Sequence, residues 1–161
     1  MKLKKTSITN YRCFKEAEID FDDHITLVVG KNGAGKTAIL DTIAVSVSTF
    51  LLGIDGGVSR SILKEDARYE FHNLNGTIDP QHQFPVIIET MGDCLNRSDI
   101  KWTRSLNSES GKTTVKDAGE LTGLAKKAQN QIMTGDKSLV LPLISYYGTG
   151  RLYACLLYTS P

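Results

Sequence analysis

The sequence predicts an α/β fold in which an antiparallel β-lobe lies beside a partial parallel core. An apolar run at 25–29 is followed by a glycine-rich loop and a helical pattern, the order of a strand–loop–helix unit. Residues 16–21 and 99–106 alternate between apolar and polar side chains, which is typical of half-buried antiparallel strands. A second apolar run at 139–147 predicts another buried strand.

The length, charge and cysteine spacing of the chain exclude several classes of protein. The chain has 161 residues, enough for one domain or part of one. Its net charge of +1 gives no global electrostatic preference for nucleic acid or membrane. The cysteines and histidines show no metal-ligand spacing, which argues against a zinc site or a disulfide framework. No signal peptide or long uncharged apolar span occurs, so we expect a cytoplasmic protein without a membrane partner.

Two antiparallel strands are expected before the glycine-rich loop. Residues 3–8 turn apolar after a basic start, and residues 16–21 place acidic and apolar side chains on opposite faces. Residues 10–15 link these strands, and Asp22 and Asp23 make the turn into the next one.

The glycine-rich loop carries the chemistry. After the strand Ile25 to Val29, the pattern G-x-x-x-x-G-K-S/T is complete, and its residues are Gly30, Lys31, Asn32, Gly33, Ala34, Gly35, Lys36 and Thr37. Glycines permit backbone angles that let successive N–H groups cradle a β-phosphate. Lys36 can reach the β- and γ-phosphates, and the Thr37 hydroxyl is placed to hold Mg²⁺. With a strand before it and a helix after it, this is a phosphate-binding loop rather than a chance glycine loop.

The loop is followed by a helix predicted over 36–52 and ended by Gly53. Its apolar stripe, expected to pack on the sheet, comprises Ile39, Leu40, Ile43, Ala44, Val47, Phe50 and Leu51. Polar residues interrupt this segment and argue against a membrane span. Residues 55–83 contain turn signals and no dependable periodicity.

The middle of the chain predicts a hairpin and a second helix. Residues 84–91 and 99–106 form the hairpin, with Trp102 as a packing anchor rather than a ligand platform. Residues 112–115 add a candidate edge strand. Thr114 and Asp117 resemble a capping box for a helix that ends near Met133 and is stopped by Gly135.

The last apolar run, 139–147, predicts a buried strand that Pro142 confines to an edge or a bulge. A glycine-rich turn follows it and ends in Arg151, at the position where open α/β sheets bind ligands. Arg151 therefore either faces a γ-phosphate or partner subunit, or is a surface arginine. The sequence leaves both alternatives open.

These motifs together carry a family resemblance. The stretch ITNYRCFKEAEIDF, followed by ITLVVGKNGAGKTAILDTIA, resembles the N-terminal lobe of RecF, SMC and Rad-type ABC-class ATPases. The shared features are the opening strand, the aromatic-Arg-x-aromatic element at 11–14, the acidic strand and a phosphate loop containing Asn32. The stretch LPLISYYGTGRL is similar to one in bacterial AAA-family ATP-binding proteins, which include ATPase subunits of anti-phage systems.

The resemblance implies ATP and Mg²⁺ as cofactors, with Arg12 approaching the nucleotide from the strand connection. It also implies a homodimer of ATPase heads in the full-length protein, acting in DNA repair or anti-phage defence, with DNA and a nuclease or other effector as partners. The alternative hypothesis is a nucleotide-sensing module that positions an effector with little turnover. A transporter subunit is disfavoured by the opening strand and the 11–14 element.

The sequence also departs from the family. Hydrolysis there needs an apolar strand ending in Asp-Glu and a signature loop, and neither occurs; the nearest stretch, Val86 to Glu89, lacks the aspartate and is assigned to the β-lobe. The sequence therefore resembles a truncated ATPase domain, spanning 1–154, and hydrolysis is expected only of the full-length protein. Residues 155–161 resemble the translation of a transposon-type sequencing adapter, although a genuine apolar C-terminal strand is the alternative.

Overall fold

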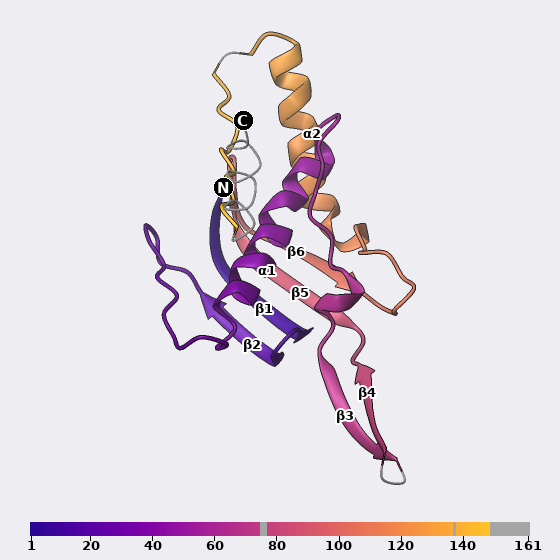
Figure 1. The fold of residues 1–161 in the computed structure, drawn as a ribbon. Coiled ribbons are helices and arrows are strands. Elements are labelled where there is room, and N and C mark those ends of the chain that lie inside the picture. The colour runs from indigo at the N-terminus through magenta and orange to yellow at the C-terminus, as the bar shows by residue number, and fades with distance from the viewer. Residues whose placement is uncertain (75–76, 137, 149–161) are drawn as a thin grey trace, which may run out of the picture.

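The computed structural model describes residues 1–74, 77–136 and 138–148. Its body is a four-stranded antiparallel sheet with the strand order β2-β1-β5-β6. The strands are β1 (Lys2–Tyr11), β2 (Phe14–Asp20), β5 (Val86–Cys94) and β6 (Arg97–Leu106). Helix α1 (Lys36–Ser48) crosses one face of this sheet (Figure 1). The fold is a mixed α/β fold with an antiparallel β-lobe, as the sequence predicts.

The β-lobe confirms the strands expected at 3–8, 16–21, 86–91 and 100–106. Strand β5 alternates as an antiparallel strand should, with Val86, Ile88 and Thr90 buried toward α1. Trp102 is confirmed as a packing anchor, because it is only 1% exposed and lies within an apolar cluster.

Helix α1 forms where it was expected, but it buries a different face. The residues it buries are Ala38, Asp41, Thr42, Ala44, Val45 and Ser46. The predicted stripe was largely wrong: Ile39, Ile43 and Val47 are only half-buried, and Leu40 is 46% exposed. The helix therefore meets the β-lobe through small and polar side chains.

The reason is a chain of buried hydroxyl groups between the helix and the sheet. Ser46 Oγ lies 2.8 Å from Thr90 Oγ1, which lies 3.2 Å from Thr6 Oγ1. The indole N–H of Trp102 donates to the Ser46 carbonyl at 3.1 Å. All four residues are at most 3% exposed, so these polar groups must satisfy one another. Their pairing fixes the position of α1 on the sheet.

Helix α1 and the 3-10 turn after it, Lys36–Gly53, have the length and hydropathy of a membrane-spanning helix, with a mean hydropathy of 1.3. The core helix of a globular domain meets the same criterion. Here 44% of the segment is buried, and its buried face packs on the sheet.

The two expected parallel strands are not strands among the described residues. Residues 25–30 and 139–148 make no ladder pairs. Ile25, Leu27 and Val29 are 77–81% exposed, and Leu143 is 94% exposed. A strand is defined by its hydrogen-bonded neighbour, and neither segment has one in the part of the chain that the structure describes. The predictions of buried strands at 25–29 and 139–147 were wrong in this respect.

The 55–83 region contains a hairpin that the sequence did not reveal. A 3-10 turn, η2 (Lys64–Asp66), leads into β3 (Tyr69–Leu74) and β4 (Thr77–His82). Within the described part of the chain these strands pair only with each other, and they project from the body at the end opposite α2 (Figure 1). The base of the hairpin is joined to the end of β1 by a bridge between Ala67 and Tyr11.

The second helix is confirmed as α2 (Gly119–Met133), and the chain turns after it at Gly135, which has a φ of 94°. The predicted capping box was wrong, because the helix starts after a 3-10 turn, η3 (Lys116–Ala118), without a side-chain cap. The Thr114 hydroxyl instead lies 3.0 Å from Ser105 Oγ. This contact tethers 112–115 to β6, but the segment is not the expected edge strand.

We expect Thr90→Val to destabilise the fold by about 1–2 kcal/mol, since valine fills the same volume but leaves the buried Thr6 hydroxyl without its partner. The change is measured as the free energy of unfolding in urea. Thr103→Val, on the other face of the same sheet, is the control and should change it by less than about 0.5 kcal/mol. Equal effects of the two substitutions would contradict a structural role for the hydroxyl chain.

Candidate nucleotide-binding site

The glycine-rich loop is shaped by left-handed backbone at two of its residues. Gly33 and Gly35 have φ angles of 82° and 86°, a conformation that residues with a side chain rarely adopt. Gly35 is also the N-cap of α1, and its carbonyl accepts the first helical hydrogen bond from Ile39. The N-terminal N–H groups and the positive end of the helix dipole therefore lie at the loop.

A pocket of about 430 Å³ opens at this loop. It is lined by Arg12, Cys13, Asn32, Gly33, Gly35, Lys36, Thr37 and Ala38. The structure thus brings Arg12, from the β1–β2 connection, beside the loop residues that the motif predicted. Gly30, Lys31 and Ala34 belong to the loop but do not line this pocket, and Arg151 lies outside the described residues.

Lys36 is folded back onto its own loop. Its ammonium group donates to the carbonyl oxygens of Gly30 and Lys31, at 2.8 and 2.7 Å. These neutral acceptors hold the side chain over the loop. A phosphate oxygen at the loop would offer the ammonium a charged acceptor in the same region, and charge-assisted hydrogen bonds are stronger than neutral ones.

The β1–β2 turn is packed directly against the loop. A β-carbon at Gly35 would lie 2.6 Å from both Cys13 Sγ and Phe14 Cζ. Gly35 is therefore required twice, by its backbone angle and by this close approach. Gly33 has the same left-handed backbone, but nothing lies within 4 Å of its β-carbon position. The motif predicted the need for glycine at 35, and only the structure shows the turn that presses on it.

Arg12 is held by two carboxylates at the edge of the pocket. Its Nη1 lies 2.6 Å from Asp41 Oδ2, and its Nε donates to Asp66 Oδ1 at 2.8 Å. Burial by itself would lower the pKa of the Arg12 guanidinium. The hydrogen bond to Asp66 and the nearby negative charges outweigh this effect and raise that pKa.

Asp41 also binds two side chains that the sequence did not assign to the site, those of Arg60 and Tyr146. Its Oδ1 accepts from Arg60 Nη2 at 2.9 Å and from the Tyr146 hydroxyl. The Arg60 guanidinium lies over the Tyr146 ring, 5.1 Å from its centre. Burial and the hydrogen bond to Asp41 raise the pKa of Tyr146. Asp41 lies on α1, the helix that begins in the glycine-rich loop, and this position was the only sequence signal of its role.

The loop residues fit a nucleotide phosphate with Mg²⁺. The left-handed glycines leave open space at Gly33, the helix N-terminus supplies N–H donors, and Thr37 places a hydroxyl at the pocket. Mg²⁺ in such sites binds few protein oxygens and keeps several waters. The described residues hold no cluster of three or more His, Cys, Asp or Glu side chains for a metal ion, so Thr37 remains the predicted protein ligand.

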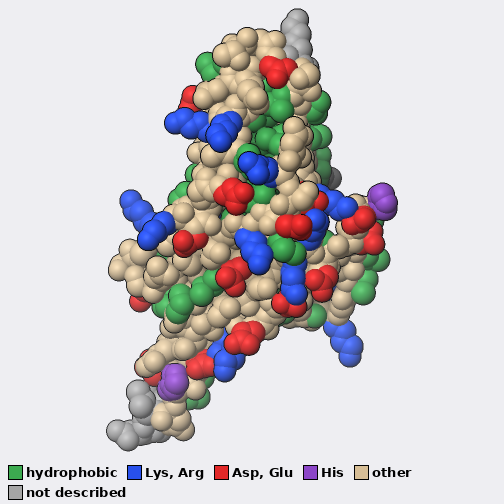
Figure 2. Space-filling view, turned by 180° about the vertical axis from the view of Figure 1, so that it is seen from behind, with side chains coloured by type: hydrophobic (Ala, Val, Ile, Leu, Met, Phe, Trp, Pro, Cys, Tyr) green, Lys and Arg blue, Asp and Glu red, His purple; other side chains and the backbone are tan. Residues whose placement is uncertain are grey.

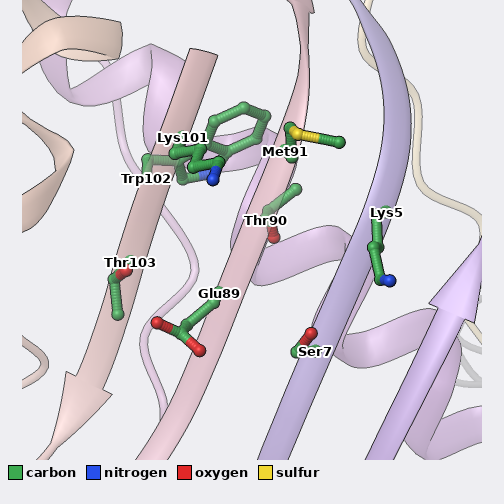
Figure 3. Close-up of a pocket in the computed structure, with 8 residues that line it drawn as sticks. All are labelled: Lys5, Ser7, Glu89, Thr90, Met91, Lys101, Trp102 and Thr103. Atoms are coloured by element: carbon green, nitrogen blue, oxygen red, sulfur yellow. The ribbon is translucent and has the colours of Figure 1, made fainter. Parts of the chain in front are cut away.

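A second hollow, of about 320 Å³, lies on the sheet (Figure 3). The residues that line it come from β1, β5 and β6 and are Lys5, Ser7, Glu89, Thr90, Met91, Lys101, Trp102 and Thr103. It has no glycine-rich backbone and no helix N-terminus, and Lys5 is engaged by Glu18 at 2.6 Å. The chemistry of phosphate binding therefore favours the pocket at the glycine-rich loop.

A glycine-rich loop that opens a helix, with Lys36 and Thr37 at its end, defines a P-loop nucleotide-binding protein. The chain belongs to the AAA domain family, whose sequence model matches residues 5–158. Within this family, its likeness is to the N-terminal lobe of RecF, Rad50 and SMC-type ABC-class ATPases, as its curated relatives and its fold both show.

The similar curated proteins are much longer than this chain. It is 56% identical over 43 residues to the DNA replication and repair protein RecF of Flavobacterium johnsoniae, covering 27% of this chain and 12% of that protein. It is 30% identical over 89 residues to RecF of Clostridioides difficile, covering 54% of this chain and 22% of that protein. The DNA double-strand break repair Rad50 ATPase of Archaeoglobus fulgidus is 46% identical over 44 residues, with 27% and 5% covered.

The fold also matches a solved structure, described under "Structural biochemistry of ATP-driven dimerization and DNA stimulated activation of SMC ATPases". The TM-score is 0.52 at 16% identity, and the match covers 100% of this chain and 93% of the other. At this identity the likeness shows the fold alone.

We expect Gly35→Ala to lower the free energy of unfolding by about 1–3 kcal/mol more than Gly33→Ala does. Both alanines would have to adopt a left-handed backbone, at a cost of about 1 kcal/mol. Only the alanine at 35 would also collide with Cys13 and Phe14. Urea unfolding of the two variants measures the difference, and equal losses would mean that the turn yields without strain.

Proposed function

We propose that this chain is the ATP-binding lobe of a RecF, Rad50 and SMC-type ATPase and that it binds Mg-ATP in the pocket at the glycine-rich loop. The observation that carries this proposal is the convergence of the helix N-terminus, Lys36, Thr37 and Arg12 on one pocket. Anions are favoured at a helix N-terminus and by lysine and arginine side chains. The relatives support the choice of adenine, since the Rad50 relative is named as a repair ATPase.

Each residue has a defined part in binding. The loop N–H groups and Asn32 surround the phosphates, and Lys36 leaves the carbonyl oxygens of Gly30 and Lys31 to contact them. Thr37 holds the metal ion, which neutralises charge between the β- and γ-phosphate oxygens. Arg12 contacts the phosphates from the β1–β2 connection with the N–H groups that its two carboxylates leave free.

In the whole protein, we propose that ATP binding brings two heads together and that hydrolysis separates them, in DNA repair. The description of the SMC structure and the names of the RecF and Rad50 relatives support this proposal. We also propose, from the sequence resemblance alone, a role in anti-phage defence with a nuclease or other effector. A cytoplasmic location is proposed on the sequence alone as well. The alternative proposal is a nucleotide sensor with little turnover.

DNA contact in the whole protein is part of the same proposal. On the face seen in Figure 2, basic and acidic side chains are interspersed rather than gathered into a basic patch. Several lysines of the described residues are paired with carboxylates, such as Lys5 with Glu18 and Lys4 with Asp93. A DNA site needs lysine and arginine side chains that are free to meet phosphates. We therefore assign no DNA contact to this face.

The domain limits are proposed as 1–154, with residues 155–161 as a non-native tail. The tail lies outside the described residues. Sequencing the gene in its source DNA beyond codon 154 tests this proposal, because a genomic stop codon after Pro161 would show that the tail is native.

Lys36→Ala should abolish Mg-ATP binding, because the loop loses the positive charge that meets the β- and γ-phosphates. Isothermal titration calorimetry measures the affinity. Lys126→Ala, on the exposed face of α2, removes the same charge far from the loop and should leave the affinity unchanged. Unchanged affinity of the Lys36 variant would refute the proposed site.

Mg-ATP should also slow the alkylation of Cys13 by about tenfold or more at a concentration of ten times Kd or higher, since this exposed thiol lines the pocket. Peptide mass mapping after treatment with N-ethylmaleimide follows each thiol separately. Cys94 is 1% exposed and should stay unmodified in both samples, which reports that the fold is intact. Equal rates for Cys13 with and without nucleotide would place the nucleotide elsewhere.

A further inference from the structure

The connection that carries Arg12 has a strained backbone that is held from outside. Arg12 has a φ of 49° and Asn10 a φ of 51°, in the left-handed region that residues with side chains rarely adopt. Such conformations persist when the surroundings fix them. Here the surroundings are residues 66–68, at the base of the β3–β4 hairpin.

Residues 66–68 clamp the connection through main-chain hydrogen bonds. Arg12 N donates to Asp66 O at 2.7 Å, and Arg68 N donates to Asn10 O at 2.9 Å. Between them lies the bridge of Tyr11 with Ala67. Both left-handed residues are therefore tied to this one short segment.

The side chain of Asp66 also contacts Arg12 directly. Its Oδ1 accepts from Arg12 Nε at 2.8 Å, and its Oδ2 accepts from Leu63 N at 3.0 Å. The side chain of Asp66 is 9% exposed, whereas that of Arg12 is 33% exposed. The carboxylate is thus buried and fixed by its own turn, and it presents one oxygen to a guanidinium that still reaches the pocket.

The geometry leaves Arg12 with donors for a ligand. A guanidinium has about five N–H donors, and the contacts with Asp66 and Asp41 engage Nε and Nη1. Nη2 makes neither of these contacts. Because Arg12 lines the pocket with Lys36 and Thr37, its remaining N–H groups are the ones that can serve an anion bound there.

We propose that Asp66 is the positioning residue for Arg12: it holds the guanidinium at the phosphate pocket and makes the base of the β3–β4 hairpin part of the nucleotide site. This inference rests on the proposed binding of Mg-ATP at the loop. Asp66 acts through Arg12 and does not touch the nucleotide. A ligand or partner that displaced the hairpin would therefore change nucleotide affinity through this residue.

The direction in which one substitution at Asp66 changes the affinity for Mg-ATP distinguishes a positioning role from a purely electrostatic one. Asp66→Asn removes a negative charge close to an anion site, and by Coulomb attraction alone it would strengthen phosphate binding. If Asp66 positions Arg12, the same substitution weakens the binding of Mg-ATP, by about tenfold, the usual worth of one charge-assisted hydrogen bond. Asp79→Asn, which removes the same charge on β4, is the matched control and should leave affinity unchanged.

A double-mutant cycle gives the decisive measurement. The affinity of the 161-residue chain for Mg-ATP is measured by calorimetry for Arg12→Ala, Asp66→Asn and the double variant. If Asp66 acts through Arg12, the double variant binds no more weakly than Arg12→Ala. Additive losses, an unchanged affinity of Asp66→Asn, or a higher one would each overturn the inference.

Two controls keep the result interpretable. Circular dichroism reports whether each variant is folded. If Asp66→Asn is unfolded, Asp66→Glu replaces it in the same cycle, because it keeps the charge but shifts the carboxylate by one methylene group. Failure of the underlying binding site is recognised separately, because Lys36→Ala would then bind Mg-ATP as well as the parent chain does.

Discussion

The ion pair between Arg12 and Asp41 is the interaction on which the site depends, because it joins the phosphate-loop helix to the connection of the β-lobe. The side chain of Asp41 is 5% exposed, and a buried carboxylate is costly unless it is paired and hydrogen-bonded. Arg12, Arg60 and the Tyr146 hydroxyl together meet this requirement. One carboxylate thereby ties the β1–β2 connection, the loop after α1 and the 139–148 segment to the helix that carries Lys36.

A second constraint follows from the polar face that α1 turns toward the sheet. Asp41, Thr42 and Ser46 share the buried face of α1 with Ala38, Ala44 and Val45, whereas the larger Leu40 and Ile43 are left on the other side of the helix. Leu40 and Ile43 there line a groove with Thr26 and Val28 of the extended segment before the loop. The buried face of the helix therefore combines apolar contacts with paired hydroxyl groups, and these polar contacts add specificity to its register on the sheet.

This division explains which parts of the fold the sequence could predict. Periodicity located α1, α2 and the four strands of the β-lobe, because each has a pattern within its own residues. The same periodicity chose the wrong face of α1, since the buried face is defined by Thr90 and Thr6 on strands far away in the chain. The apolar runs at 25–29 and 139–147 have strand composition, but a ladder also needs a neighbour, which no local pattern supplies. The β3–β4 hairpin was missed because Phe71 and Ile78 face solvent, so the residues of its strands whose burial is described show no buried face that would produce a recognisable alternation.

The candidate site likewise has residues that the sequence could predict and residues that only the fold brings together. The phosphate loop is a continuous motif whose chemistry dictates its spacing, so its glycines, Lys36 and Thr37 could be predicted from the sequence. Asp66 and Arg12 are 54 residues apart, and Tyr146 and Asp41 are 105 apart, so only folding brings them together.

These long-range partners also set the electrostatic balance of the pocket. Two carboxylates partly neutralise the charge of Arg12 in the free protein, so a phosphate at its remaining N–H groups would meet a reduced positive charge. The net gain from Arg12 is therefore smaller than its full charge would give, whereas the acceptors that Lys36 has among the described residues are neutral carbonyl groups. We therefore expect Lys36 to contribute more to the affinity for phosphate than Arg12 does. The main contribution of Arg12 should be to fix the orientation of a bound nucleotide.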